Sequence, residues 1–404
     1  MKFRVILSAA LLLWGFHMRG QNYGNLSGRN TGLNVITTAV PFLMIAPDAR
    51  SGSMGDAGVS SSPDIYSMHW NPAKYAVIKS DLSFGLAYSP WLRNLVPDIN
   101  LAYVGAAKRI DDMSTVAASL RFFTLGDIFF TTDGTNGVYY RPSEWAFDGT
   151  YARKLTDNLS GAVAGRFIYS NLTLGQNVQG AETTAGISVA ADVAVFWEKD
   201  VNWFSDINAH FAWGINISNI GNKMGYSKSS IKKDFIPTNL RLGPTLTLDL
   251  DEYNSIAFSL DLNKLLVPSP PIIKLDSNAR PILDDGGNYI IEKGRSNDVN
   301  TVAGMIQSFY DAPDGFGEEL REWSLSFGTE YWYNKVFALR GGFFYEDRSK
   351  GNRKFFTLGA GLKYNVFGLD FSYLVPIDSR NNPLQNTLRF ALTFDLDAYS
   401  SKKK

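Results

Sequence analysis

The chain has 404 residues, which is enough for two soluble domains or for one large barrel. Its 39 Lys and Arg residues balance its 39 Asp and Glu residues, so charge gives no reason to expect a nucleic-acid partner. Cysteine is absent, which excludes disulfides, thiolate metal sites and cysteine nucleophiles, while 14% aromatic residues and 36 glycines favour strands with aromatic girdles over a helical enzyme.

The first twenty residues have the pattern of an export signal. Lys2 and Arg4 form a positively charged start, and an almost unbroken apolar run follows over residues 5–16. We therefore predict a signal peptide over residues 1–20, cleaved before Gln21. The alternative is a short membrane anchor, but this run is well short of the roughly 20 apolar residues that span a bilayer. Since no later apolar run reaches that length, membrane insertion would have to use strands.

Residues 21–80 are rich in Gly, Ser, Asn and Pro and show no sustained strand pattern. From residue 81 onward, alternating apolar and polar segments are separated by polar turns. In the last segment Leu388, Phe390 and Leu392 share one face, and Arg389 and Thr393 share the other. Neighbouring side chains on a strand point to opposite faces, and a membrane barrel needs one apolar face and one polar face.

This alternation predicts fourteen strands, an even number as expected for a single-chain bacterial barrel with both termini in the periplasm. The strands are expected near residues 82–90, 99–108, 115–124, 144–153, 159–170, 184–197, 207–218, 238–250, 255–264, 322–331, 336–346, 354–364, 367–375 and 387–396. The prediction is therefore an all-β fold, a transmembrane antiparallel β-barrel over residues 81–397, followed by a basic tail at 398–404. A soluble β-sandwich also alternates and is the alternative.

The lengths of the connections test the barrel prediction independently. Every second connection is short and mostly polar, at residues 109–114, 154–158, 198–206, 251–254, 332–335 and around Asn365. The other connections include the long stretches 125–143, 219–237 and 265–321. Outer-membrane barrels have short periplasmic turns and long extracellular loops, whereas a soluble sandwich has no reason to alternate in this way.

No arrangement of residues in the sequence indicates catalysis. The three histidines, His17, His69 and His210, have no zinc-binding spacing. The chain has no G-x-S-x-G elbow, no P-loop and no G-x-G-x-x-G after a strand. We therefore predict a protein that is not an enzyme and that uses no cofactor or metal ion.

Charged side chains fall on the inward face of several predicted strands. The expected ion-pair network of the lumen consists of Arg121, Arg166, Asp192, Glu330, Arg340, Asp370 and Arg389. Because both signs are mixed, ion pairs that brace the barrel are the favoured interpretation. The alternative is a polar path or a carboxylate-binding site.

Two of the outer loops are unusually apolar. Their candidate partner-docking residues are Leu125, Phe129, Phe130, Leu265, Leu266, Val267, Ile272 and Ile273. Exposed apolar patches often mark partner surfaces. The alternative is that these loops fold inward and close the mouth of the barrel.

The segment before the first strand carries a resemblance to a known family. It reads ARSGSMGDAG at residues 49–58, PDIY at 63–66 and WNPA at 70–73. These stretches resemble the N-terminal hatch of FadL-like barrels, and ITTAVPFLMIAPDAR at residues 36–50 resembles the PorV family, the FadL-like barrels of the type IX secretion system. The matching hatch residues are Arg50, Gly55, Asp64, Asn71, Pro72 and Ala73, so residues 21–80 are expected to form a hatch or plug.

The resemblance implies an outer-membrane protein of a Gram-negative bacterium that takes part in secretion. PorV-like proteins collect cargo with a C-terminal sorting domain from the large translocon barrel and hand it to a sortase-like peptidase complex, which attaches it to lipopolysaccharide. The implied partners are therefore the translocon, the cargo, the attachment complex and outer-membrane lipid. The rival function is transport of small hydrophobic molecules, which FadL-like folds also perform.

Overall fold

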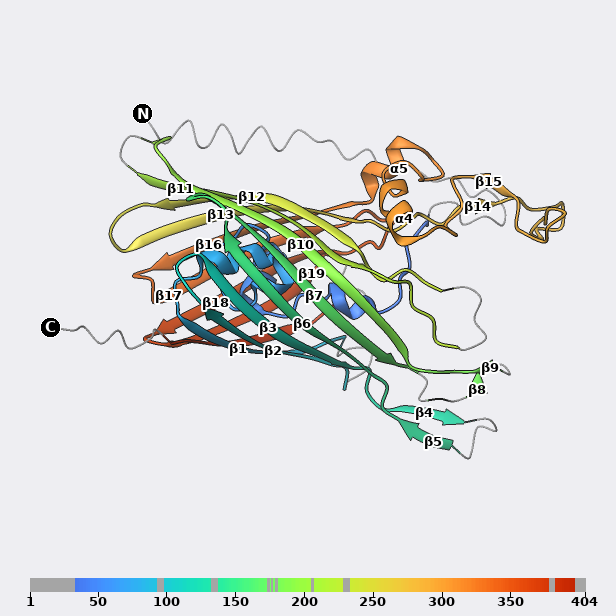
Figure 1. Ribbon diagram of the computed structural model, residues 1–404, viewed down its shortest axis with the longest axis horizontal. Coiled ribbons are helices and arrows are strands. Elements are labelled where there is room, and N and C mark those ends of the chain that lie inside the picture. Colours follow the sequence, from blue (N-terminus) through green and yellow to red (C-terminus); the bar gives the residue numbers. More distant parts are fainter. Residues whose placement is uncertain are drawn as a thin grey trace. The chain divides into compact units, whose positions relative to one another are not determined.

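Fourteen antiparallel strands form one closed barrel (Figure 1). The computed structural model describes residues 33–92, 98–131, 137–172, 175, 177–178, 181–204, 207–227, 233–377 and 382–396. The barrel strands are β1 (Leu82–Pro90), β2 (Asn100–Arg109), β3 (Ser114–Thr124), β6 (Ser143–Lys154), β7 (Leu159–Asn171), β10 (Gly186–Val201), β11 (Asn208–Gly221), β12 (Asn239–Asp249), β13 (Asn254–Leu265), β16 (Trp323–Tyr333), β17 (Phe337–Tyr345), β18 (Lys354–Tyr364), β19 (Phe367–Pro376) and β20 (Leu388–Leu396).

Pairing between the first and last strands closes the ring. Leu82 of β1 lies opposite Leu396 of β20, and Tyr88 lies opposite Phe390. All fourteen predicted strands are confirmed, with boundaries that differ by a few residues. The largest difference is β10, which continues to Val201 because its end pairs with β11 beyond the last residue that pairs with β7.

Along each strand, apolar side chains face outward and polar side chains face inward, as a barrel in a lipid bilayer requires. On β1, Phe84, Leu86 and Tyr88 are exposed on the outer face, whereas Ser83 and Ser89 are buried inside. In water such an outer face would be unfavourable, but in a bilayer it contacts hydrocarbon. None of the helices in the described part of the chain has both the length and the apolar character that a membrane crossing demands.

The two ends of the barrel differ as predicted. The short turns include residues 110–113 and the tight turn at Asn365, whose φ of 53° is the left-handed conformation that asparagine tolerates. The long loops gather at the opposite end (Figure 1). They contain elements that alternation alone did not predict: β4 (Ile128–Thr131), β5 (Gly137–Tyr140), β8 (Asn177–Val178), β9 (Ala181–Glu182), β14 (Ile272–Ile273), β15 (Ile291–Lys293) and α4 (Thr301–Gln307). The same long loop also contains α5 (Phe316–Arg321).

Residues 35–80, which we call the N-terminal segment, lie within the ring of strands (Figure 1). The segment contains η2 (Pro41–Met44), α2 (Ala49–Gly52), α3 (Ser67–Trp70) and η3 (Pro72–Val77) and no strand. η3 contacts β3, β6, β7 and β10, while α2 contacts β18, β19 and β20. The inner faces of the strands are lined by small residues, which leave room for Ile65, Met68 and Tyr75 to pack. The predicted signal peptide and basic tail lie outside the described residues.

Candidate functional site

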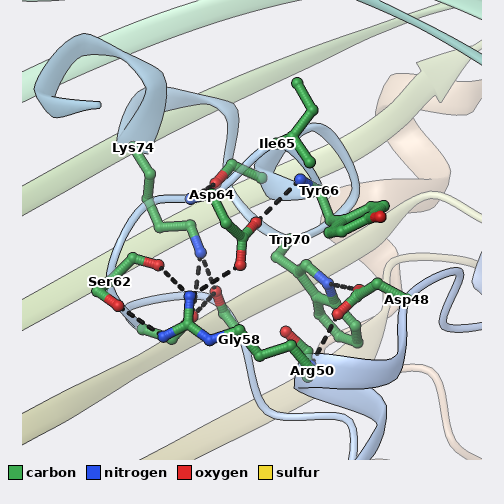
Figure 2. Close-up of polar contacts among 12 residues, drawn as sticks. Asp48, Arg50, Gly58, Ser62, Asp64, Ile65, Tyr66, Trp70 and Lys74 are labelled. Atoms are coloured by element: carbon green, nitrogen blue, oxygen red, sulfur yellow. Dashed lines mark hydrogen bonds and ion pairs between the residues drawn. The ribbon is translucent and has the colours of Figure 1, made fainter. Parts of the chain in front are cut away.

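Arg50, one of the resemblance residues, connects the N-terminal segment to the barrel wall. Its Nε and Nη2 donate to the two carboxylate oxygens of Glu330 on β16, at 2.9 and 2.7 Å. Its Nη1 donates to Asp64 Oδ2 at 2.9 Å and to the carbonyl of Ser62 at 3.0 Å (Figure 2). One buried guanidinium therefore holds a loop of the segment and a strand together, in the bidentate geometry that arginine provides.

Asp48 and Trp70 form a second buried pair within the segment. Asp48 Oδ2 accepts a hydrogen bond from the backbone N–H of Ser51, which caps α2, and Oδ1 accepts from Trp70 Nε1 at 2.6 Å (Figure 2). Burial raises the pKa of Asp48 to about 6, and the nearby charge of Asp64 acts in the same direction. The pair ties α2 to α3 across more than twenty residues of chain.

The Asn71-Pro72-Ala73 motif forms the turn into η3. Asn71 Oδ1 accepts from the backbone N–H of Ala73, and Asn71 Nδ2 donates to the carbonyls of Val59 and Val195, both at 3.0 Å. Pro72 occupies the first turn of η3, where its missing N–H leaves no donor unpaired. The carbonyl of Ala73 accepts from Ser160 Oγ on β7 at 3.0 Å. The motif therefore fixes the segment against β7 and β10.

Lys74 follows the motif and is fully buried. Its Nζ donates to the carbonyl of Gly58 at 2.8 Å and to Ser61 Oγ at 3.1 Å (Figure 2). Burial lowers the pKa of Lys74 to about 8 because the charged ammonium loses its hydration. An ammonium bound by neutral oxygens in this position stabilises the loop at residues 58–61 at the cost of desolvation.

Glycines allow the backbone of the segment to touch the backbone of β17. Gly55 has a φ of 69°, and its N–H donates to Thr357 Oγ1 at 2.8 Å. A Cβ at Gly342 would lie 2.1 Å from the nitrogen of Gly55 and from the carbonyl carbon of Met54. Only residues without a side chain permit this approach.

The predicted lumen charges form two separate clusters. In the first, Arg166 pairs with Asp148 and, at 3.1 Å, with Asp192. In the second, Arg340 pairs with Glu330 at 2.6 Å and with Asp370 at 2.7 Å, and Arg50 joins from the N-terminal segment. Each cluster crosses neighbouring strands on the inner face.

Arg121 and Arg389 differ from the other five predicted residues, since among the described residues neither pairs with a carboxylate on a strand. Arg121 donates to the carbonyl of Leu43 at 2.7 Å and contacts His69 Nδ1 at 3.1 Å. Arg389 donates to the carbonyl of Gly52 and lies 3.1 Å from Asp56. Strand phase could not reveal these partners, because they come from the N-terminal segment that lies between the walls.

The predicted docking residues have mixed positions, and some face inward. Leu266 and Val267 are only 3% and 2% exposed, so they cannot contribute to a docking surface. Leu265 is half-buried and Leu125 packs against an apolar cluster at the mouth of the barrel, as the inward alternative expected. Ile272 and Ile273 are half-buried in β14, and Phe129 is exposed and packs on Tyr139. The side chain of Phe130 lies outside the described residues.

Within the long loop at residues 265–321, six exposed apolar side chains lie on or next to its two helices. On α5, Phe316 is 76% exposed and Leu320 is 56% exposed, four positions apart on one helix face. On α4, Val302 and Ile306 are exposed with the same spacing, and Phe309 and Tyr310 follow. We call these six residues the helical patch. The prediction selected residues 265–273 because they are apolar, whereas the exposed apolar side chains lie further along the same loop.

Buried lysines attach α5 to the barrel. Lys264 Nζ at the end of β13 lies 3.2 Å from Glu319 Oε2 and also pairs with Glu322. Lys350, from the loop between β17 and β18, lies 2.6 Å from Glu318 and 2.9 Å from Glu322. The part of the helical patch that lies on α5 is therefore held in place at this end of the barrel.

Sequence reasoning did not single out Asp48, Trp70 or Lys74, although all three are central to the segment. Two of the three lie inside the stretches that carry the family resemblance, and Lys74 directly follows the third stretch. Their importance lies in the contacts they make with residues distant in the sequence, and a local sequence pattern does not contain such contacts. In the part of the chain that the structure describes, no cluster of three or more His, Cys, Asp or Glu side chains could hold a metal ion.

Comparison with known proteins gives one family match. The profile of a family described as "Type IX secretion system protein PorV" matches residues 28–272, which is more than half of the chain. No curated protein matches the sequence.

Several solved structures show similarity at low sequence identity. They include the toluene transporter TodX of Pseudomonas putida (11% identity, 89% of this chain and 98% of that chain, TM-score 0.48), the toluene transporter TbuX of Ralstonia pickettii (11%, 86% and 98%, 0.44) and a FadL homologue of Pseudomonas aeruginosa (10%, 90% and 99%, 0.41).

Proposed function

Because the chain belongs to the PorV family of type IX secretion system proteins, we propose that it carries secreted cargo between two outer-membrane complexes. In this function it binds cargo with a C-terminal sorting domain at the large translocon barrel. It then delivers the cargo to the sortase-like peptidase complex that attaches it to lipopolysaccharide. The family match carries the proposal, and the family is one of the outer membrane of Gram-negative bacteria. The proposal involves no catalysis and no cofactor.

The helical patch is the surface that we propose for docking. Its six apolar side chains are exposed on or next to α4 and α5, and partner surfaces commonly carry such patches. The ion pairs of Lys264 and Lys350 hold α5 rigidly, which lowers the entropy lost on binding. Residues 265–273 are a poorer candidate, since deleting the buried Leu266 and Val267 would damage the fold itself.

Affinity purification from native membranes tests the function and the surface separately. Tagged wild-type protein is expected to co-purify with the translocon barrel and with cargo. Replacing Phe316 and Leu320 together by Ser should remove at least one of these partners, whereas Tyr289→Ser, an equally exposed aromatic on the β14–β15 extension, serves as control. Retention of both partners by the double variant would reject the helical patch. Absence of both from the wild type would reject the carrier function.

Transport of small hydrophobic molecules is the alternative function. The described interior offers it little support, because the N-terminal segment fills the ring and the inner faces carry the charged clusters. Lipid or detergent bound within the purified barrel would favour this alternative.

A further inference from the structure

Two basic residues lie on the lipid-facing side of the wall at the short-turn end, which is the periplasmic end of an outer-membrane barrel. Lys108 is near the end of β2, four residues after Val104. Arg153 is near the end of β6, two residues after Tyr151. Val104 and Tyr151 are exposed on the outer face. Because alternate residues of a strand share a face, Lys108 and Arg153 also point outward, and both are exposed.

Strand pairing places these two residues on either side of β3. Lys108 lies opposite Val116 of β3, and Val116 lies opposite Tyr151 of β6. Arg153 lies opposite Ser114, two residues nearer the turn. Neighbouring strands are about 4.8 Å apart, so the backbones of β2 and β6 are separated by about 10 Å. Lysine and arginine have long side chains that can meet over such a gap, so one small anion can contact both.

The charges of both groups are left uncompensated by the protein. Arg153 Nη1 donates to the hydroxyl oxygens of Tyr151 at 3.2 Å and Ser114 at 3.4 Å, which are neutral. Among the described residues, no carboxylate lies within 4.0 Å of Lys108 Nζ or of the Arg153 guanidinium. Two positive charges therefore remain on this part of the outer surface.

Two neighbouring charges are engaged within the protein. Arg109, next to Lys108, pairs with Asp81. Asp111 lies in the turn between β2 and β3, and its carboxylate accepts the backbone N–H of Met113 at 2.8 Å. These contacts leave Lys108, together with Arg153 on β6, able to bind an anion from outside the protein.

Apolar side chains surround the two basic groups on the same side of the wall. Ile110 and Met113 of the turn after β2 are 58% and 44% exposed, and Leu155 of the turn after β6 is 58% exposed. Val116 and Leu120 continue this surface along the outer face of β3. Positive charge beside exposed apolar groups, at the end of a membrane strand, matches a phospholipid. Its phosphate lies at the membrane surface and its acyl chains lie in the hydrocarbon.

We propose that Lys108 and Arg153 bind the phosphate of an anionic glycerophospholipid in the periplasmic leaflet of the outer membrane. The ammonium and the guanidinium donate to the phosphate oxygens, and the acyl chains pack along Val116 and Leu120. A lipid with a net negative headgroup is favoured, because a zwitterionic headgroup brings a positive charge of its own next to two others. The proposal rests on the outer-membrane location of the barrel and not on the carrier function.

Native mass spectrometry of the purified full chain in a non-ionic detergent tests the proposal. The probes are dioctanoyl phosphatidylglycerol, the zwitterionic dioctanoyl phosphatidylcholine, dioctanoylglycerol, which lacks phosphate, and inorganic phosphate, which lacks acyl chains. We expect phosphatidylglycerol to bind at least about fivefold more tightly than each of the others. Equal binding of dioctanoylglycerol or of phosphatidylcholine would overturn the role of the charges. Equal binding of inorganic phosphate would assign the site to a free anion and overturn the lipid assignment.

Variants locate the site. Lys108→Gln and Arg153→Gln should each weaken binding of phosphatidylglycerol about fivefold, and the double variant about 25-fold. Combining Lys108→Arg with Arg153→Lys keeps both charges and should preserve binding. Lys199→Gln on β10 is the matched control, because this exposed lysine at the same end of the barrel lies opposite Phe211 and not beside a second basic residue.

Each variant is first checked for folding by its heat-modifiable mobility on gels, which these exposed positions should leave intact. Unchanged binding in the double glutamine variant would overturn the proposal. So would a loss in Lys199→Gln, or in the charge-preserving combination, as large as the loss in the double glutamine variant.

Discussion

Arg50 and Glu330 are 280 positions apart in the sequence, yet Arg50 Nη2 lies 2.7 Å from Glu330 Oε1. Glu330 also accepts from Arg340 on the neighbouring strand at 2.6 Å, so one carboxylate serves two guanidinium groups. The carboxylate of Glu330 therefore links the N-terminal segment to two strands of the barrel wall. Removing this carboxylate should destabilise both the segment and the barrel.

The first prediction concerns this shared carboxylate. Glu330→Gln leaves the buried Arg50 and Arg340 without their common counter-charge, and breaking a buried pair on one side typically costs about 3–5 kcal/mol. We expect a clear drop in the temperature at which the barrel loses its heat-modifiable mobility on gels. Asp127→Asn breaks the exposed pair with Arg141, which solvent screens, and should leave the melting temperature nearly unchanged. Equal melting of the two variants would contradict the prediction.

The second prediction concerns the contact between the N-terminal segment and β17. In Gly342→Ala, the new Cβ would lie 2.1 Å from the backbone of Met54 and Gly55, which cannot move aside as a flexible side chain could. We expect the segment to be displaced, seen as faster amide exchange over residues 50–58. Gly165→Ala on β7 is the matched control, because a Cβ there meets nothing within 4 Å. Similar exchange in both variants would show that the contact is not rigid.

The third prediction is a pH dependence that originates at Lys74. Its pKa is about 8 in the folded protein and 10.5 as the ordinary value, so the folded state holds fewer protons than the unfolded state between pH 8 and 10.5. Stability from this group must therefore rise with pH across that window, by up to about 3 kcal/mol. Urea unfolding at pH 7.5 and 10.5 should show this gain in the wild type relative to Lys74→Met. A pH-independent difference between the two proteins would refute it.

The fourth prediction concerns the attachment of α5. Lys350→Met removes a lysine that pairs with both Glu318 and Glu322, and both carboxylates are buried. We expect α5 to detach locally, with faster amide exchange and proteolysis at residues 316–322 while the barrel stays folded. Lys293→Met, which removes an exposed pair with Asp314, should leave α5 protected. Protection of α5 in Lys350→Met would mean that the ion pairs of Lys264 and apolar packing are enough to hold the helix.

The strands could be predicted because their signal is local. On β20 the apolar face made by Leu388, Phe390 and Leu392 and the opposite face with Arg389 are both visible in the chain itself. The polar partners could not be predicted in the same way. Arg389 was correctly placed inside, but its partners Gly52 and Asp56 lie more than 300 positions earlier. The helical patch was missed for a related reason, since exposure of Phe316 and Leu320 depends on where the loop folds.

The sequence by itself determined the barrel of this protein: fourteen strands, their phase, and the difference between its two ends. It could do so because every strand in a bilayer must turn apolar side chains toward lipid and polar side chains toward the interior, and this pattern repeats every two residues. Only the tertiary structure decided which charges meet and which loop residues stay exposed. These features depend on the N-terminal segment and on strands distant in sequence coming together inside the ring, which no periodicity records.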